Sequence, residues 1–254
     1  MPAASDHDSI PSGLRNLCIL EALAAGGRPM TATEINAALN LPVPTIHRLV
    51  GTLESEGFLS RQIDGRSYLP GPRLRQLARG AMLGGYYSQP RHDTLIRLNA
   101  QVGETCNLSI PDGDAMLYID RVETQWPLRI QLQVGSRVPL HATASGKMCL
   151  AMLPEALRER ILRRAPLEAH SAQTITDPGR LRAALDEIRR QGHATDNEEL
   201  MAGMIALAVP VLDAEGRLAA TVSFHAPVQR LTLEQGMRHL PALQAAASEL
   251  AQDL

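Results

Sequence analysis

Apolar residues recur at helical spacing near the start of the chain, and local signals mark where helices should begin and end. The apolar positions of the first predicted helix are Leu14, Leu17, Leu20 and Ala24. Gly26-Gly27 followed by Pro29 should end this helix. Thr31 and Glu34 have the Ser/Thr-x-x-Glu spacing of a capping box, in which each side chain accepts a hydrogen bond from a free backbone amide. A short second helix should therefore begin after Thr31.

A third helix should follow the break at Asn40-Leu41-Pro42, because Pro44 is tolerated in a first turn. Its buried face is predicted from apolar residues at i, i+3, i+4 and i+7, which are Ile46, Leu49, Val50 and Leu53. A step of about 100° per residue places Arg48 on the opposite side, among short polar side chains. Such a face suits the major groove of DNA. The candidate DNA-binding residues of this helix are Thr45, His47, Arg48 and Thr52.

The pattern changes to that of two short strands after Gly57. Segments 58–62 and 66–69 flank Asp64-Gly65, and an Asp-Gly pair favours a hairpin turn that needs positive φ at both central residues. Arg61 and Arg66 lie near the predicted tip, where a wing meets phosphates. Three helices followed directly by a basic hairpin predict a winged helix-turn-helix domain over residues 1–71.

The rest of the chain mixes helical and strand patterns. A helix from Pro72 to Gly85 has few core positions, so residues 72–88 are interpreted as a linker helix. Beyond it, helices are expected at 91–102, 144–152, 154–163, 177–191 and 232–254. Strands are expected at 106–110, 115–121, 205–212 and 219–225. Turns at 111–113 and 213–216 join neighbouring strands, which predicts an α+β domain with an antiparallel sheet over 89–254.

Charge and composition limit these interpretations. The net charge is −2, and the first 72 residues carry five arginines against seven acidic residues, so DNA binding must rest on geometry rather than on excess positive charge. The three cysteines have no C-x-x-C spacing and fit reduced core thiols. No run of about 18 apolar residues and no secretory signal occurs, so no membrane association is expected and the predicted location is cytoplasmic.

The sequence carries no motif that predicts an enzyme. Ser145-Gly146-Lys147 is neither a phosphate-binding P-loop nor an S-x-x-K motif, and G-x-S-x-G is absent. His141 and His225 have no neighbours at metal-ligand spacing. We therefore expect no catalytic residue, no metal site and no cofactor.

The most informative candidate site lies where residues 138–143 run into a predicted helix. Thr143 suits the N-cap, which leaves the backbone amides of Ala144, Ser145 and Gly146 without partners inside the helix. Free amides and the partial positive charge of a helix N-terminus favour an anion. The residues alone leave a second interpretation open, a tightly packed helix start that binds nothing.

Six segments carry a family resemblance: SGLRNLCILEAL, MTATEINAALNLPVPTIHRLVGTLESEGFLSR, DGRSYLPGPRL, HATASGKMCLAMLP, TITDPGRLRAALDEIRRQGHATDNEE and GMIALAVPVLDAEGRLAATVSFHAP. They resemble the IclR family of bacterial transcription regulators, and the similarity runs from about Ser12 to the C-terminal helix. The resemblance implies a winged helix-turn-helix, a linker helix and a GAF-like effector-binding domain.

The resemblance also implies where the effector binds. The positions that match the family's pocket are Ala144, Ser145, Asp196, Met204, Ala206, Ser223 and His225. Ala206 stands where a cysteine is frequent, and His225 replaces one of two serines. We expect an organic or aromatic carboxylate at the amides of residues 144–146, with Ser223 and His225 bonded to its other end. Asp196 should pair with a ligand hydroxyl or with protonated His225.

These patterns favour a regulator that binds double-stranded operator DNA under the control of a small-molecule effector. A homodimer or a dimer of dimers is expected, because palindromic operators need two recognition helices about one helical turn apart. A metabolic enzyme with an attached helical domain is the main alternative. A winged helix that binds protein instead of DNA is the third, because the N-terminal region is weakly acidic.

Overall fold

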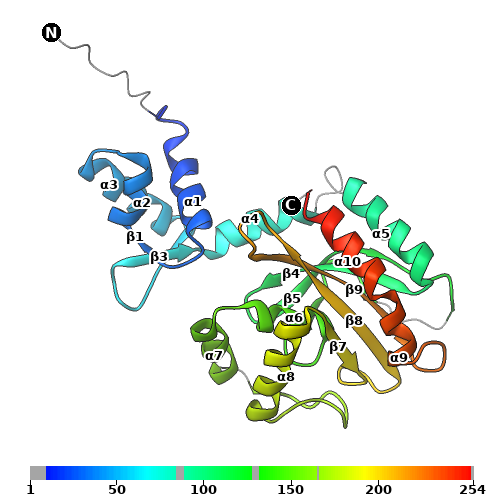
Figure 1. Cartoon of the computed structure of the whole chain (residues 1–254). Helices are drawn as coiled ribbons and strands as arrows, with labels where there is room; N and C mark the ends of the chain where they lie inside the picture. The colour runs from blue at the N-terminus through cyan, green and yellow to red at the C-terminus, as the bar shows by residue number, and fades with distance from the viewer. Residues whose placement is uncertain (1–9, 84–88, 128–131, 165, 253–254) are drawn as a thin grey trace. The chain divides into compact units, whose positions relative to one another are not determined.

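The computed structural model describes residues 10–83, 89–127, 132–164 and 166–252 (Figure 1). The chain divides into two compact units, Met1–Ala81 and Met82–Leu254, which are described separately below. Helix α4 (Pro72–Leu83) occupies the first part of the expected linker, and residues 84–88 of that linker lie outside the described residues. No helix in the described ranges has both the length and the apolarity needed to cross a bilayer.

The N-terminal unit contains most of α4 and, in the described residues before it, three further helices and a small antiparallel sheet of order β1-β3-β2. Its elements before α4 are α1 (Arg15–Gly26), β1 (Met30–Thr31), α2 (Ala32–Leu39), α3 (Val43–Ser55), β2 (Leu59–Arg61) and β3 (Ser67–Pro70). Thr31 and Glu34 form both hydrogen bonds of the predicted capping box. Pro44 lies in the first turn of α3, as expected. The predicted winged helix-turn-helix is confirmed, and β1 adds a strand that the sequence pattern did not predict.

The buried face of α1 differs from the prediction. Leu14 and Leu17 are 49% and 53% exposed, and the residues of α1 that enter the core are Ile19, Leu20 and Leu23. The reason lies in the composition of the helix, which is apolar on more than one side. Periodicity therefore predicts a helix there without deciding which side packs against the rest of the unit.

The C-terminal unit is an antiparallel six-stranded sheet of order β6-β5-β4-β9-β8-β7, with helices on both faces (Figure 1). Its strands are β4 (Thr105–Asp112), β5 (Ala115–Val122), β6 (Arg137–Pro139), β7 (Ala194–Asn197), β8 (Met204–Leu212) and β9 (Leu218–Pro227). Its helices are α5 (Gln89–Val102), α6 (Ala144–Met152), α7 (Glu155–Arg164), α8 (Pro178–Gln191), α9 (Leu233–Gly236) and α10 (Leu240–Leu250). The predicted α+β class is confirmed.

Two details of this unit were not predicted. The sheet's outermost strands, β6 and β7, have three and four residues, too few for alternation to be recognised. The helix expected over 232–254 is divided into α9, a 3₁₀ turn at Met237–His239 and α10. Pro241 in the first turn of α10 explains the break, because proline has no amide hydrogen to continue a preceding helix.

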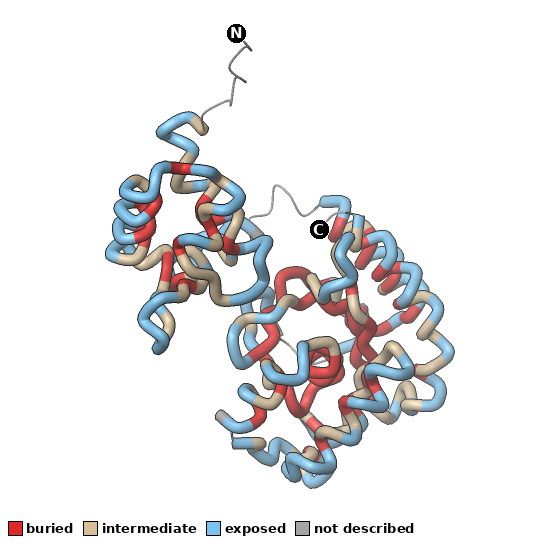
Figure 2. The backbone as a smooth tube through the Cα atoms, turned by 60° about the vertical axis from the view of Figure 1, so that its left-hand side comes forward, coloured by how far each residue is buried: buried red, intermediate tan, exposed pale blue. Residues whose placement is uncertain are grey.

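The two faces of the central strands have different chemistry. The apolar face packs in the core with α5 and α10, and its residues on β4 and β9 are Cys106, Leu108, Val222 and Phe224. The opposite face is polar but also buried, and its residues are Asn107, Ser109, Thr221, Ser223 and His225. Helix α6 packs against β8 and β9. Figure 2 shows the resulting run of buried backbone through this unit.

Candidate functional site

Helix α3 presents the predicted DNA-binding residues on its outer surface. His47, Arg48 and Thr52 are exposed and Thr45 is half-buried, whereas Ile46 and its apolar partners lie in the core. The Thr52 hydroxyl donates to the Arg48 carbonyl oxygen at 3.0 Å, within the helix itself. Within the described ranges, the Arg48 guanidinium makes no hydrogen bond or ion pair. Arg48 is therefore available to an external partner.

The two wing arginines have different surroundings. Arg61 donates to both carboxylate oxygens of Glu54 on α3, at 2.8 and 2.6 Å, and to the Gly65 carbonyl oxygen at 3.0 Å. These bonds hold the pKa of Glu54 below its usual value. The exposed Arg66 side chain has no partner among the described residues. Arg61 thus links the β2–β3 hairpin to α3 through hydrogen bonds to Glu54, a role that was not predicted from the sequence.

A second group of predicted residues lines a cavity between the start of α6 and strands β7, β8 and β9. The members that the structure brings together there are Ala144, Ser145, Asp196, Met204, Ala206, Ser223 and His225. Its other lining residues are Tyr118, Leu132, Thr143, Leu200, Met201 and Ile205. The cavity volume is about 30 Å³, room for a water molecule or two and far less than a bound metabolite needs.

The start of α6 offers two free amides, not three. The Gly146 amide donates to the Thr143 hydroxyl at 3.0 Å, so the expectation that this amide is free is wrong. The amides of Ala144 and Ser145 have no partner within the described ranges. Gly146 does not line the cavity, and a Cβ there would lie 2.5 Å from the Leu140 carbonyl oxygen. Because residue 146 has no side chain, the start of α6 can lie close to the backbone of Leu140.

Asp196 reaches the cavity from the edge strand β7. Its Oδ1 accepts hydrogen bonds from the amides of Glu199 at 2.7 Å and Leu200 at 3.3 Å. Burial raises the pKa of Asp196 to about 7. The group is therefore partly protonated near neutral pH, and as an acid it can donate a hydrogen bond as well as accept one.

His225 on β9 is neutral in this cavity. Burial and the nearby Arg121 guanidinium lower the pKa of His225 to about 3, so the expected pairing of a protonated His225 with Asp196 is wrong. The Nδ1 atom lies 3.2 Å from the Asn107 side-chain nitrogen. The Nε2 atom is fully buried and has no hydrogen-bond partner among the described residues. One polar atom of the cavity wall thus lacks a partner of its own.

Comparisons with known proteins decide the family. The model of the IclR helix-turn-helix domain matches residues 14–62, and the model of the bacterial transcriptional regulator IclR C-terminal domain matches residues 89–252. The chain belongs to the IclR family. It is 44% identical to the probable transcriptional regulator SauR of Cupriavidus necator over 246 residues, which is 97% of each chain. It is 30% identical to the transcriptional repressor IclR of Escherichia coli, covering 91% of this chain and 84% of that protein.

Solved structures of IclR proteins have the same fold. The Thermotoga maritima IclR matches with a TM-score of 0.64 and 30% identity, covering 94% of this chain and 97% of the other. An IclR homolog of Microbacterium hydrocarbonoxydans, crystallised with 4-hydroxybenzoate, matches with a TM-score of 0.62, 30% identity and the same coverage. This IclR-family chain is thus a transcriptional regulator with a helix-turn-helix DNA-binding domain, and its curated relatives are regulators rather than enzymes.

Sequence reasoning missed several residues around the pocket of this IclR-family protein. Tyr118, Leu200 and Met201 line it, and Asn107 and Arg121 stand behind His225. A signal for Asn107 was present, because β4 alternates polar and apolar residues as β9 does. The polar residues on β4 are Thr105, Asn107 and Ser109. No local pattern identifies Arg121, whose role depends on the pairing of β4 with β5.

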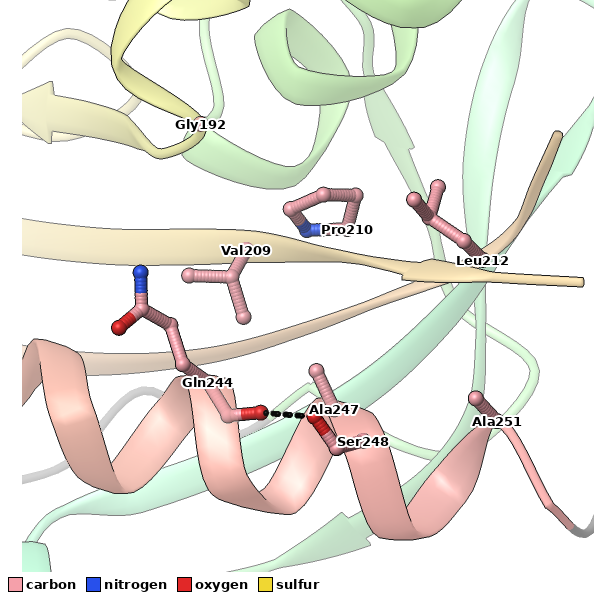
Figure 3. A pocket seen from close by; sticks show the side chains of 8 residues that line it. All are labelled: Gly192, Val209, Pro210, Leu212, Gln244, Ala247, Ser248 and Ala251. Carbon is pink, nitrogen blue, oxygen red and sulfur yellow. Dashed lines mark hydrogen bonds between the residues drawn. The ribbon is translucent and has the colours of Figure 1, made fainter. Parts of the chain in front are cut away.

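A larger hollow, about 390 Å³ in volume, lies between β8 and α10 (Figure 3). Its lining is small and uncharged: Gly192, Val209, Pro210, Leu212, Gln244, Ala247, Ser248 and Ala251. The Ser248 hydroxyl is bonded to the Gln244 carbonyl oxygen at 3.0 Å. The hollow therefore offers an IclR effector no charged side chain to bind.

The predicted absence of a metal site concerned His141 and His225. His141 Nε2 lies 2.9 Å from the Glu168 carbonyl oxygen, and the described residues contain no cluster of three potential metal ligands.

Proposed function

We propose that this regulator binds operator DNA through α3 and the β2–β3 wing, and that a small carboxylate in the α6–β9 cavity changes its operator affinity. The observation that carries the proposal is the convergence of predicted effector residues from α6, β7, β8 and β9 on one buried cavity. The 4-hydroxybenzoate bound by the Microbacterium hydrocarbonoxydans homolog supports an aromatic or other organic acid as the class of effector.

The charges around the cavity favour an acid held by neutral donors. Lys147, the only lysine of the chain, is buried in an ion pair with Glu199. The carboxylate is therefore placed at the amides of Ala144 and Ser145, where the partial positive charge of the helix N-terminus stabilises it. Met204 and Ala206 supply an apolar wall in this proposal, and Ser223 and His225 bond the far end of the effector.

The small cavity volume requires that binding displaces part of the lining. An effector typically needs roughly 300 Å³ or more, about ten times what the structure offers. Leu200 and Met201 lie in the turn between β7 and β8, and Met201 is 46% exposed. We assign the displacement to this turn, because Leu200 and Met201 line the cavity and Met201 is also exposed to solvent.

On the DNA side, α3 is assigned to the major groove. Arg48 and its neighbours Thr45, His47 and Thr52 contact base edges and nearby phosphates, and the wing arginines Arg61 and Arg66 contact phosphates. A homodimer or dimer of dimers presents two such helices to a palindromic operator in the bacterial cytoplasm.

Two measurements on the full-length chain test the proposal. Binding to its own promoter DNA should weaken steeply as salt rises, and salt-independent binding would favour the protein-binding alternative. Calorimetry against acids, amides and sugars should show a preference for acids. Wild-type affinity in the double variant Ser223→Ala/His225→Ala, or a preference for neutral compounds, would overturn the effector assignment, and turnover of an acid would favour the enzyme alternative.

A further inference from the structure

We propose that Arg121 and Asn107 fix His225 in the tautomer with its proton on Nε2, so that the cavity selects an acid with a second oxygen acceptor at the β9 end. An amine or ammonium at that end is rejected. This inference rests on the proposed function, because it specifies the class of effector that the same cavity takes. It assigns Asn107 and Arg121 as positioning residues and His225 as a residue that determines specificity.

The tautomer follows from a chain of three hydrogen-bonding groups. Arg121 Nη1 donates to Asn107 Oδ1 at 3.0 Å, and a guanidinium can only donate. The amide of Asn107 is thereby oriented with its NH₂ group toward His225 Nδ1, at 3.2 Å. Because this NH₂ group also only donates, Nδ1 must be the unprotonated nitrogen. A neutral imidazole with a free Nδ1 carries its proton on Nε2.

The same chain excludes the imidazolium form. A protonated His225 would place an N–H on Nδ1 against the N–H of Asn107, and two donors cannot bond each other. The Arg121 charge on the far side of Asn107 opposes a second positive charge, and burial has the same effect on the pKa of His225. Two other titratable groups line the cavity with this histidine: Asp196, paired in register through Ala206 on β8, and Tyr118 on β5.

The Nε2–H group is a donor without an acceptor. His225 is 9% exposed and lines the cavity, and in the described part of the chain no atom accepts a hydrogen bond from its fully buried Nε2. Burial of an N–H that no protein atom accepts costs free energy, and a ligand oxygen placed against it would accept that hydrogen bond. A ligand N–H there would leave two donors facing each other. The site therefore matches a dicarboxylate or a keto acid, and it disfavours an amino acid of equal length.

The tautomer can be read directly in the full-length chain labelled with ¹⁵N-histidine. A two-bond ¹H–¹⁵N correlation spectrum separates protonated from unprotonated ring nitrogens, and His225→Gln identifies the His225 signals among those of the eight histidines. We expect a protonated Nε2 and an unprotonated Nδ1, unchanged from about pH 5.5 to about pH 8. A proton on Nδ1, or titration of the ring in this range, overturns the proposal.

Asn107→Asp tests the positioning role, because its carboxylate accepts where the amide donated. We expect the His225 Nδ1 signal to shift to the protonated type in this variant. His141 is the internal control, since its Nε2 faces the Glu168 carbonyl oxygen at 2.9 Å and does not depend on Asn107. An unchanged His225 signal in a folded variant overturns the role of Asn107, and if the variant does not fold, the wild-type spectrum still decides the tautomer.

Selection is tested with two matched pairs of compounds: succinate against 4-aminobutyrate, and terephthalate against 4-(aminomethyl)benzoate. We expect each diacid to bind about ten-fold or more tightly than its ammonium counterpart and to shift the His225 Nε2 signal. Equal binding within both pairs, or no shift of that signal by either diacid, overturns the selection. These spectra need no DNA, so diacid binding that leaves operator affinity unchanged contradicts the proposed function and not this inference.

Discussion

His225 and Asp196 face one cavity, and burial shifts their pKa values in opposite directions. The pKa of His225 falls from 6.5 to about 3, and the pKa of Asp196 rises from 3.8 to about 7. Burial disfavours the charged form of each group, which is the acid form of a histidine and the base form of a carboxyl group. Both side chains therefore tend to be neutral when the protein is folded and the cavity is empty.

These shifts predict opposite pH dependences of stability. The stability contributed by the lowered pKa of His225 is present above pH 6.5 and is lost as pH falls toward 3. The stability contributed by the raised pKa of Asp196 is present below pH 3.8 and is lost as pH rises through 7. Between pH 3.8 and 6.5 the two slopes oppose each other.

Single variants should separate the two slopes. From about pH 4 to about pH 6.5, Asp196→Asn should make the free energy of unfolding rise more steeply with pH than in wild type, and His225→Gln should do the opposite. The slope of each variant should differ from the wild-type slope by at most about 1.4 kcal/mol per pH unit, which is the effect of one proton. Urea unfolding across this range measures it. Ser223→Ala is the control, because it changes the same cavity without removing a titrating group, and slopes that match wild type in all three variants would contradict both assignments.

Single-residue roles could be predicted from the sequence only where the partners are close along the chain. Thr31 and Glu34 are three positions apart, and their capping box was predicted correctly. Arg61 was assigned to DNA alone, because its partner Glu54 lies on a different element. The prediction of a protonated His225 was wrong, because its protonation depends on Asn107, 118 positions away, and on burial that the sequence does not reveal.

Among the secondary-structure elements, α3 is the one whose outer face the proposed function depends on most. Arg48→Ala should weaken operator binding by about 1–3 kcal/mol and leave the thermal unfolding midpoint unchanged, because the Arg48 side chain is exposed and its guanidinium makes no hydrogen bond or ion pair in the described part of the chain. A mobility-shift titration at fixed salt measures the loss. Arg180→Ala, an exposed arginine on α8, is the matched control. Equal operator affinity in both variants would remove Arg48 from the reading face.

The wing should contribute affinity without base preference. Arg66→Ala should reduce the slope of the logarithm of the DNA-binding constant against the logarithm of salt concentration by about one unit. The double variant Arg61→Ala/Arg66→Ala should reduce this slope by about two units. Specific and random DNA should weaken together. Because Arg61 also bonds Glu54, its replacement should loosen the hairpin as well. Loss of discrimination between sequences with an unchanged salt slope would show that the wing reads bases.

The start of α6 lies close to the backbone of Leu140, and this approach requires that residue 146 has no side chain. Gly146→Ala would place a Cβ 2.5 Å from backbone atoms of Leu140, so the helix start or the preceding segment must move. We expect a loss of roughly 1–3 kcal/mol of stability, measured by urea unfolding. Gly51→Ala on α3, where an added Cβ meets nothing within 4 Å, is the control and should not lose stability. A stable Gly146→Ala variant would contradict the close approach.

The elements themselves were predicted well where the pattern is long. The helices around 43–55 and 178–191 and the four longer strands lie close to their predicted positions. The two shortest strands of the large sheet were missed, and the core face of α1 was wrong because its apolar residues surround more than one side. The missed strand β7 carries Asp196 to the cavity, whereas the start of α6 and the longer strands β8 and β9 supply other parts of its wall.

At the scale of the whole molecule, two compact units match the two domain models of one regulator family. The expected division into residues 1–71, 72–88 and 89–254 remains a prediction. The expected location of the effector site came from the predicted helix start after Thr143 and from the resemblance to the family. Free amides at the start of α6 were expected from the sequence, and the structure adds the burial that lowers the pKa of His225 to about 3 and raises that of Asp196 to about 7.

The central claim of the proposed function is that an acid bound in the C-terminal unit changes the affinity of the N-terminal unit for DNA. Fluorescence anisotropy of labelled promoter DNA, titrated with the full-length chain at fixed salt, measures it directly. The dissociation constant is compared without ligand, with each acid of a panel, and with the amide of the same acid. We predict that at least one acid changes the constant about 5- to 150-fold while its amide does not. A constant that no acid changes, or that amides change equally, would contradict the account.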